Sequence, residues 1–103
     1  MKRASIAITA DGLATIVEAV AGRKIIAITY LLTTSGANTV IWQSDATAIS
    51  GTITIATTVQ DGQAGAPGPT GILGILETAS GEALKLNVSE DTTIGGYISY
   101  ILA

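Results

Sequence analysis

Short runs in which apolar and polar residues alternate fill most of this chain, and Gly, Ser, Asn and Asp separate the runs. A period of two is typical of strands with one face in a core and one face in solvent. Residues 52–58 and 84–88 show it most clearly, because isoleucine, leucine and valine there alternate with Thr, Lys and Asn. The pattern predicts an all-β fold, either a jelly roll or a β-sandwich of seven to eight short antiparallel strands.

The most apolar run, residues 23–34, is hydrophobic on both faces of the predicted strand. One face carries Ile26, Ile28, Tyr30 and Leu32, and the other carries Ile25, Ala27 and Leu31. A strand that is apolar on both faces is either central in its sheet or covered by a partner on its second face. Residues 97–102 have the same character, and residues 39–44 place Val40 and Trp42 on one face.

The N-terminal part of the chain reads as a hairpin. Residues 5–10 alternate, Asp11-Gly12 is a dipeptide that favours a type I′ turn, and residues 13–20 form the returning strand. We therefore divide the chain into residues 1–12, an N-terminal arm or first hairpin strand, and residues 13–103, the β-sandwich domain. An arm that becomes ordered on a partner would carry the cations of Lys2 and Arg3.

Residues 61–71 have glycine at every third position, which is the register of collagen. Three triplets are too few to hold a triple helix unaided, and a polyproline-like surface loop is the simpler interpretation. The alternative is that a three-fold oligomer gathers three such loops at its axis. This alternative makes a homotrimer the favoured self-association, with a dimer as the second choice.

Composition narrows the classes of function. The chain has 103 residues, of which 48% are hydrophobic and only 13% charged, and its formal net charge is −3. Five basic residues in runs of at most two do not form a phosphate-binding patch, so we expect no nucleic-acid partner. No apolar run approaches the about 20 residues of a membrane span, so we expect no membrane partner. Asp11, Gly12 and Glu18 interrupt the region that a secretory leader would need.

Groups that carry catalysis are scarce, since the chain has no histidine and no cysteine. Glu77 and Glu82 flank a turn and could face one another, as the paired carboxylates of a glycosidase do. Glu90 and Asp91 could offer oxygen ligands to Ca²⁺. Solvated loop charges are the simpler interpretation of both pairs. We therefore expect no catalytic residue, no metal and no cofactor.

The single tryptophan, Trp42, has three interpretations. Beside Val40 on one strand face it is a core anchor. Near Tyr30, Tyr97 or Tyr100 it is a hot spot of an oligomer interface. The third interpretation is a platform on which a sugar ring stacks.

Several stretches together resemble a group of small virion proteins of tailed phages and prophages. The resemblance lies in VAGRKI at 20–25, SGANTV at 35–40, Gln43-Ser44 with Ser50-Gly51, LETASGEALKLN at 76–87 and IGGYISY at 94–100. The chain departs from the group at residues 62–71. The resemblance implies a capsid decoration or cement protein, made in the bacterial cytoplasm and located on the capsid surface, that binds the major capsid protein and itself.

The interface residues that we predict from these considerations are Lys2, Arg3, Ile6, Ile8, Tyr30, Trp42, Tyr97 and Tyr100. Two alternatives to a decoration protein stay open. One is a structural component of the phage tail, baseplate or fibre, and the other is a carbohydrate-binding β-sandwich on the virion. Strands with apolar faces suit all three, because each of them acts through surface contact and not through catalysis.

Overall fold

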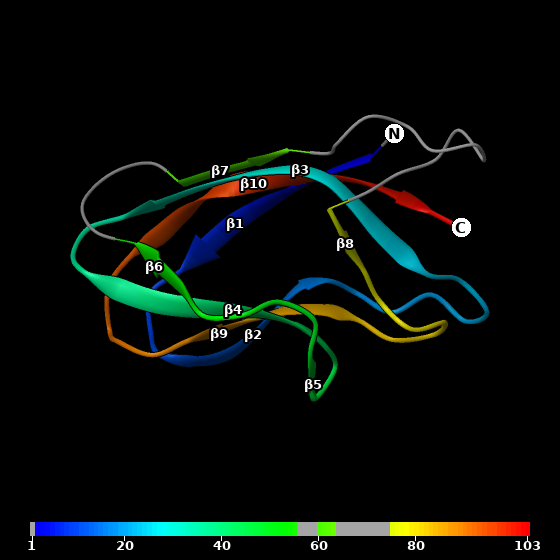
Figure 1. Cartoon of the computed structure of the whole chain (residues 1–103), viewed down its shortest axis with the longest axis horizontal. Coiled ribbons are helices and arrows are strands. Elements are labelled where there is room, and N and C mark those ends of the chain that lie inside the picture. The colour runs from blue at the N-terminus through cyan, green and yellow to red at the C-terminus, as the bar shows by residue number, and fades with distance from the viewer. Residues whose placement is uncertain (1, 56–59, 64–74) are drawn as a thin grey trace.

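The structure of the chain is a computed structural model that describes residues 2–55, 60–63 and 75–103, with the backbone alone at 60–63. These residues form ten β-strands and no helix (Figure 1), which confirms the predicted all-β class. The strands are β1 (Lys2–Ile8), β2 (Gly12–Val17), β3 (Ile25–Thr34), β4 (Asn38–Ser44), β5 (Thr47–Ala48), β6 (Ile53–Ile55), β7 (Gln60–Gln63), β8 (Leu76–Glu77), β9 (Leu84–Val88) and β10 (Ile94–Leu102). Ten strands replace the predicted seven to eight because β5 and β8 are two-residue strands.

The strands form two antiparallel sheets that lie one above the other in Figure 1. Sheet A has the order β1-β10-β3-β7, with β8 also pairing with β3, and sheet B has the order β2-β9-β4-β5, with β6 also pairing with β4. The pairing is nested, because β1 pairs with β10, β2 with β9, β3 with β7 and β4 with β6. Two facing sheets of this kind are compatible with the predicted β-sandwich.

The hydrophobic core lies between the two sheets and takes side chains from both. The fully buried residues include Leu32 and Ile98 from sheet A and Val40, Trp42 and Leu86 from sheet B, each with 0% exposure. The ring of Tyr30 from sheet A packs against the ring of Trp42 from sheet B in this interior, with the two ring centroids 5.2 Å apart. Trp42 is therefore a core anchor, as the first of its three interpretations predicted.

The predicted N-terminal hairpin is wrong in its pairing. β1 and β2 belong to different sheets, and the residues between them carry the chain from sheet A to sheet B. Asp11 does not have the positive φ that a type I′ turn requires, although Gly12 does, with φ of 110°. Long-range pairing overrides the local turn signal, because every residue from Lys2 to Ile8 finds a partner on β10.

The two-faced strand predicted at residues 23–34 is β3, and it is central in sheet A as expected. Its face assignment changes at a β-bulge, where the register passes from Ser99 opposite Thr29 to Tyr100 opposite Ala27, with Ile28 left over. The bulge shifts the alternation by one residue. Ile25 and Ala27 therefore enter the core together with Tyr30 and Leu32, so the predicted grouping of Ile26 and Ile28 with Tyr30 is wrong.

Gly96 in β10 marks a close approach of two backbones. Its φ is 137°, and a Cβ atom at this position would lie 1.8 Å from the carbonyl oxygen of Leu31. Close backbone approach is the role that the Gly95-Gly96 dipeptide suggests in a strand. Most of the collagen-register segment, residues 64–71, lies outside the described residues, and so do residues 56–58 of the strand predicted at 52–58.

Candidate interaction surface

The outer face of sheet A carries side chains from its three longest strands. These are the residues that alternate with the core residues, and the register aligns them in rows across the sheet. The rows are Ala7–Gly95–Thr33, Ser5–Tyr97–Leu31, Arg3–Ser99–Thr29 and Ile101–Ile26. Apolar and small hydroxyl-bearing side chains thus alternate on this part of the face, and Arg3 is the only charged residue that β1, β3 and β10 place there. The row of Ile26 continues to the exposed Glu77 on β8, so the margin of the face carries a second charge.

The guanidinium group of Arg3 lies against an aromatic ring on this face. The guanidinium carbon of Arg3 is 4.6 Å from the centroid of the Tyr97 ring, and the two residues occupy adjacent rows on β1 and β10. A cation held over an aromatic face is partly desolvated and fixed in orientation. Arg3 and Tyr97 together form an exposed, ordered pair of the residue types that protein interfaces favour.

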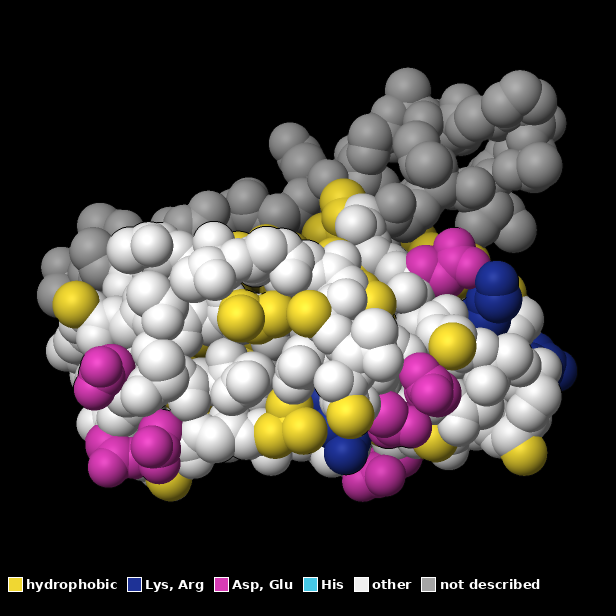
Figure 2. Space-filling view, turned by 60° about the horizontal axis from the view of Figure 1, so that its bottom comes forward, with side chains coloured by type: hydrophobic (Ala, Val, Ile, Leu, Met, Phe, Trp, Pro, Cys, Tyr) yellow, Lys and Arg dark blue, Asp and Glu magenta, His cyan; other side chains and the backbone are white. Residues whose placement is uncertain are grey.

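The outer face of sheet B is different in character. Its rows include Leu13–Asn87–Ile41 and Thr15–Lys85–Gln43, so polar residues outnumber apolar ones. Figure 2, which brings the lower side of Figure 1 forward, shows hydrophobic side chains in small groups among polar atoms. The rows of this face are therefore more polar than those of the outer face of sheet A.

The β1–β2 and β9–β10 connections lie side by side at the left of Figure 1, and Figure 2 shows acidic side chains at this end as well as further to the right. The backbone N–H of Asp11 donates a 2.8 Å hydrogen bond to Oδ1 of Asp91, and Glu90 is the next residue in that connection. No group of three His, Cys, Asp or Glu residues placed to hold a metal ion occurs among residues 2–55, 60–63 and 75–103.

The structure divides the eight predicted interface residues into two groups. Ile6, Ile8, Tyr30 and Trp42 are at most 9% exposed and belong to the core, so they do not contact a partner of the folded chain. The sequence correctly indicated that these residues alternate with others along their strands, but their side chains lie on the inner faces of the two sheets. The others are exposed or partly exposed, namely Lys2, Arg3, Tyr97 and Tyr100, although Tyr100 packs against the core.

Sequence reasoning missed several residues of the outer face of sheet A. Leu31 and Ile101 are partly exposed there, whereas Ile26, which shares a row with Ile101, is 9% exposed and so as buried as Tyr30. The signal was present in the apolarity of both faces of residues 23–34 and 97–102. The bulge at Ile28 made these outer residues hard to assign from the sequence, because the outer apolar residue before the bulge is Ile26 and the outer apolar residue after it is Leu31.

The two carboxylates that flank residues 78–81 do not form a pair. Glu77 belongs to β8 in sheet A, whereas Glu82 leads into β9 in sheet B. Glu77 accepts a 2.7 Å hydrogen bond from Nζ of Lys24, and Glu82 accepts one of 2.6 Å from Oγ of Ser44. Each carboxylate thus has its own contact, and the arrangement is a connection between sheets and not a pair of catalytic acids.

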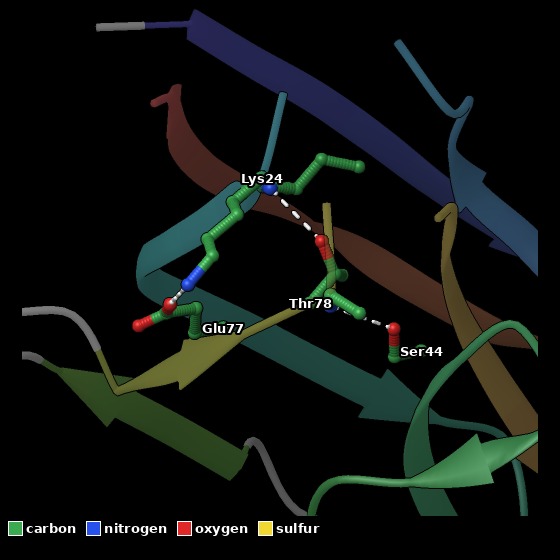
Figure 3. Close-up of polar contacts among 6 residues, drawn as sticks. Lys24, Ser44, Glu77 and Thr78 are labelled. Carbon is green, nitrogen blue, oxygen red and sulfur yellow. Dashed lines mark hydrogen bonds and ion pairs between the residues drawn. The ribbon is translucent and has the colours of Figure 1, made fainter. Parts of the chain in front are cut away.

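This connection is tied to both sheets by side-chain hydroxyls (Figure 3). Oγ1 of Thr78, a residue that is 2% exposed, accepts a 2.9 Å hydrogen bond from the backbone N–H of Ile25 in β3. Oγ of Ser44 in β4 accepts one of 3.0 Å from the backbone N–H of Ala79. These hydrogen bonds join the connection to both sheets, so they have a role in the fold.

A shallow hollow beside the β9–β10 connection is lined by Ala37, Asn38, Thr39, Thr54, Ser89 and Glu90. The hydroxyls of Thr39 and Ser89 lie 2.6 Å apart and bond to each other. Both side-chain atoms of Asn38 are also used internally. The side-chain polar atoms of Asn38, Thr39 and Ser89 are thus engaged with one another or with the backbone.

Comparison with family models, with curated proteins and with solved structures gives no match for this chain. Within its described part the chain contains no helix with the length and hydrophobicity needed to cross a membrane.

Proposed function

We propose that this protein is a structural subunit of a phage virion, a capsid decoration or cement protein that binds the outside of the major capsid protein lattice and stabilises the head. The observation that carries the proposal is the outer face of sheet A, where apolar and small hydroxyl-bearing side chains of β1, β3 and β10 surround the Arg3–Tyr97 pair. A rigid sheet face of this kind is suited to lie on another protein. Many copies, each bound weakly, would join neighbouring capsid subunits.

We infer in addition that the two sheets form a jelly roll. In a jelly roll one long antiparallel hairpin is rolled up, so the first strand pairs with the last, the second with the one before it, and so on inward. The nested pairs β1–β10, β2–β9, β3–β7 and β4–β6 follow this rule, with β5 and β8 as additions. Jelly rolls are common in viral capsid proteins and also in lectins, so the topology supports a virion role by analogy only.

The carbohydrate-binding alternative has lost its main support. A sugar-binding site needs an exposed aromatic ring, and Trp42 is fully buried beside Tyr30. Tyr97 remains on the surface, but the Arg3 guanidinium covers one face of its ring. The tail, baseplate or fibre alternative stays open, because its sequence argument concerns residues 61–71, most of which lie outside the described residues.

Counting copies in purified particles tests the proposal. Quantitative mass spectrometry of virions from the host strain should find roughly hundreds of copies per particle, as a lattice-binding protein requires. A count of a few to a few dozen copies per particle would contradict the decoration role and support the tail alternative. Absence of the protein from particles would overturn both.

A binding measurement tests whether the outer face of sheet A is the surface that binds the capsid. Purified protein added to heads that lack it should raise the temperature at which the heads release DNA, and Arg3→Gln or Tyr97→Ser should reduce binding about tenfold. Lys85→Gln is the matched control, because Lys85 lies on the outer face of sheet B, and it should change binding less than about twofold. Equal effects of the Arg3 and Lys85 variants would contradict the assigned face.

A further inference from the structure

The four sheet edges of this fold differ in how well they are protected against pairing with another chain. An edge strand has a row of unpaired backbone groups, and proteins usually protect such edges by making them short or by a bulge. β5, β6 and β8 contain two or three residues, β7 contains four, and β2 has a bulge at Ile16. β1 contains seven residues in unbroken register with β10, and no second strand of the described chain pairs with it.

We propose that β1 pairs antiparallel with β1 of a second copy of this chain and forms a two-fold symmetric dimer with one sheet A continuous through both copies. A two-fold axis perpendicular to the sheet keeps the two cores on the same side. It also keeps the side-chain alternation in phase, which requires that residues of the same face lie opposite each other.

The sequence of β1 is complementary to itself in the register that pairs all seven residues. In that register Ser5 lies opposite Ser5 at the axis, Arg3 opposite Ala7, Lys2 opposite Ile8 and Ala4 opposite Ile6. Each cation thus lies opposite a small or apolar residue, and no like charges face each other across the strands. Sliding the strands until Arg3 faces Arg3 would bring like charges together and leave most of the strand unpaired.

The strand next to this edge provides a second, independent observation. β2 is the edge strand of sheet B on the same side of the molecule, and it contacts β1. Leu13 on β2 is 47% exposed, the highest value among the large hydrophobic side chains of the described residues. A second copy seated along β1 would bring its own β2 beside this strand, and because Leu13 lies on the outer face of sheet B, the copy would cover it from one side.

The general composition favours such an association. Only 13% of the residues are charged, which is too few to keep a small domain apart from its own copies by a charged surface. In the dimer the outer faces of both A sheets point the same way. The pair would thus present two copies of the proposed binding face to one surface, and the dimer does not depend on that proposal being correct.

Disulfide trapping tests the pairing directly, because the chain has no cysteine of its own. Residues directly opposite in an antiparallel pair have Cβ atoms about 4.5–5.5 Å apart, near the range that a disulfide spans. Under mild oxidation Ser5→Cys should form a covalent dimer at least about tenfold faster than Ser80→Cys. Ser80 is an exposed residue in the turn between β8 and β9, neither of which pairs with β1, and it serves as the matched control.

Substitution of Ser5 by charged residues tests the register in which Ser5 lies opposite Ser5 of the second copy. These substitutions should not disrupt the fold, because Ser5 is exposed and its side chain has no described hydrogen bond. Ser5→Lys and Ser5→Glu should each raise the dimer dissociation constant about fivefold, and an equimolar mixture of the two should restore it. Sedimentation equilibrium measures the association, and circular dichroism verifies that each variant is folded.

Three outcomes would overturn the proposal. They are a chain that stays monomeric at millimolar concentration, a stable trimer, and equal cross-linking rates for the Ser5 and Ser80 cysteine variants. A folded Ser5→Lys variant that dimerises as well as the original chain would do the same. Because none of these measurements uses a capsid, their outcome is independent of the proposed decoration role.

Discussion

The side-chain amide of Asn38 donates a 2.7 Å hydrogen bond to Oγ1 of Thr92, and Oγ1 of Thr92 lies 3.0 Å from Oγ1 of Thr34. Asn38 begins β4 in sheet B and Thr34 ends β3 in sheet A, so Thr92 joins the two sheets at this end of the molecule. The side-chain oxygen of Asn38 also accepts hydrogen bonds from the backbone N–H groups of Thr39 and Glu90. Every polar atom of this 3% exposed side chain is therefore satisfied.

Replacement of Asn38 should be among the most destabilising changes in the chain. Asn38→Ala removes the partner of several partly buried donors and acceptors at once, so we expect a loss of about 3 kcal/mol in the free energy of unfolding. Asn87→Ala, at an exposed position on the outer face of β9, is the control and should cost less than about 0.5 kcal/mol. Urea denaturation of the two variants measures the difference, and equal midpoints would contradict the role of Asn38.

Gly96 should tolerate no side chain. Its φ of 137° and the 1.8 Å approach of Leu31 O to an added Cβ predict that Gly96→Ala costs at least about 3 kcal/mol. Gly51 has no positive φ and open space around an added Cβ, so Gly51→Ala should be nearly neutral. Thermal unfolding of both variants compares them. A Gly96→Ala variant as stable as Gly51→Ala would show that β10 and β3 lie further apart than described.

Trp42 is the largest side chain of the core, and its Nε1 atom has no hydrogen-bond partner among the described residues. Trp42→Ala leaves a large cavity and should cost about 4 kcal/mol. Trp42→Phe keeps most of the packing and removes the unpaired donor, so it should cost at least about 2 kcal/mol less. Because Trp42 is the only tryptophan, its fluorescence should shift to longer wavelength on unfolding. Emission of the folded chain at the wavelength of solvated tryptophan would contradict its burial.

The hydroxyl of Thr78 should matter more than its methyl group. Thr78→Val keeps the shape but leaves the backbone N–H of Ile25 without its acceptor, which should cost about 2 kcal/mol. Thr15→Val makes the same chemical change at an exposed position in β2 and should stay within about 0.5 kcal/mol of the original chain. Chemical denaturation of both variants gives the comparison, and a neutral Thr78→Val variant would show that the hydrogen bond adds nothing.

The ion pair between Lys24 and Glu77 should contribute little, although its N–O distance is only 2.7 Å. Its side chains are 48% and 51% exposed, and water screens a pair of this kind. A double-mutant cycle of Lys24→Ala and Glu77→Ala should give a coupling below about 0.5 kcal/mol that falls further in 1 M salt. A coupling above about 1.5 kcal/mol would mean that the pair is more buried than described.

Much of the fold follows from patterns that extend over a few residues. The alternation at residues 84–88 places Leu84, Leu86 and Val88 in the core, and residues 53–55 follow the same rule. The side chain of every second residue points to the same face of a strand, so a run of five residues is enough to assign an inward face. The all-β class and the core position of Trp42 required no more than this.

Strand pairing and the position of the bulge required the tertiary structure. The Asp11-Gly12 signal describes a local turn, but whether the next strand pairs with β1 or crosses to sheet B depends on β9 and β10, which come about 70 residues later. The leftover Ile28 opposite Ser99 and Tyr100 likewise depends on the partner strand. The sequence by itself determined which residues are apolar and how they alternate. Only the tertiary structure decided which of them face outward, because burial depends on contacts between segments that are distant in the chain.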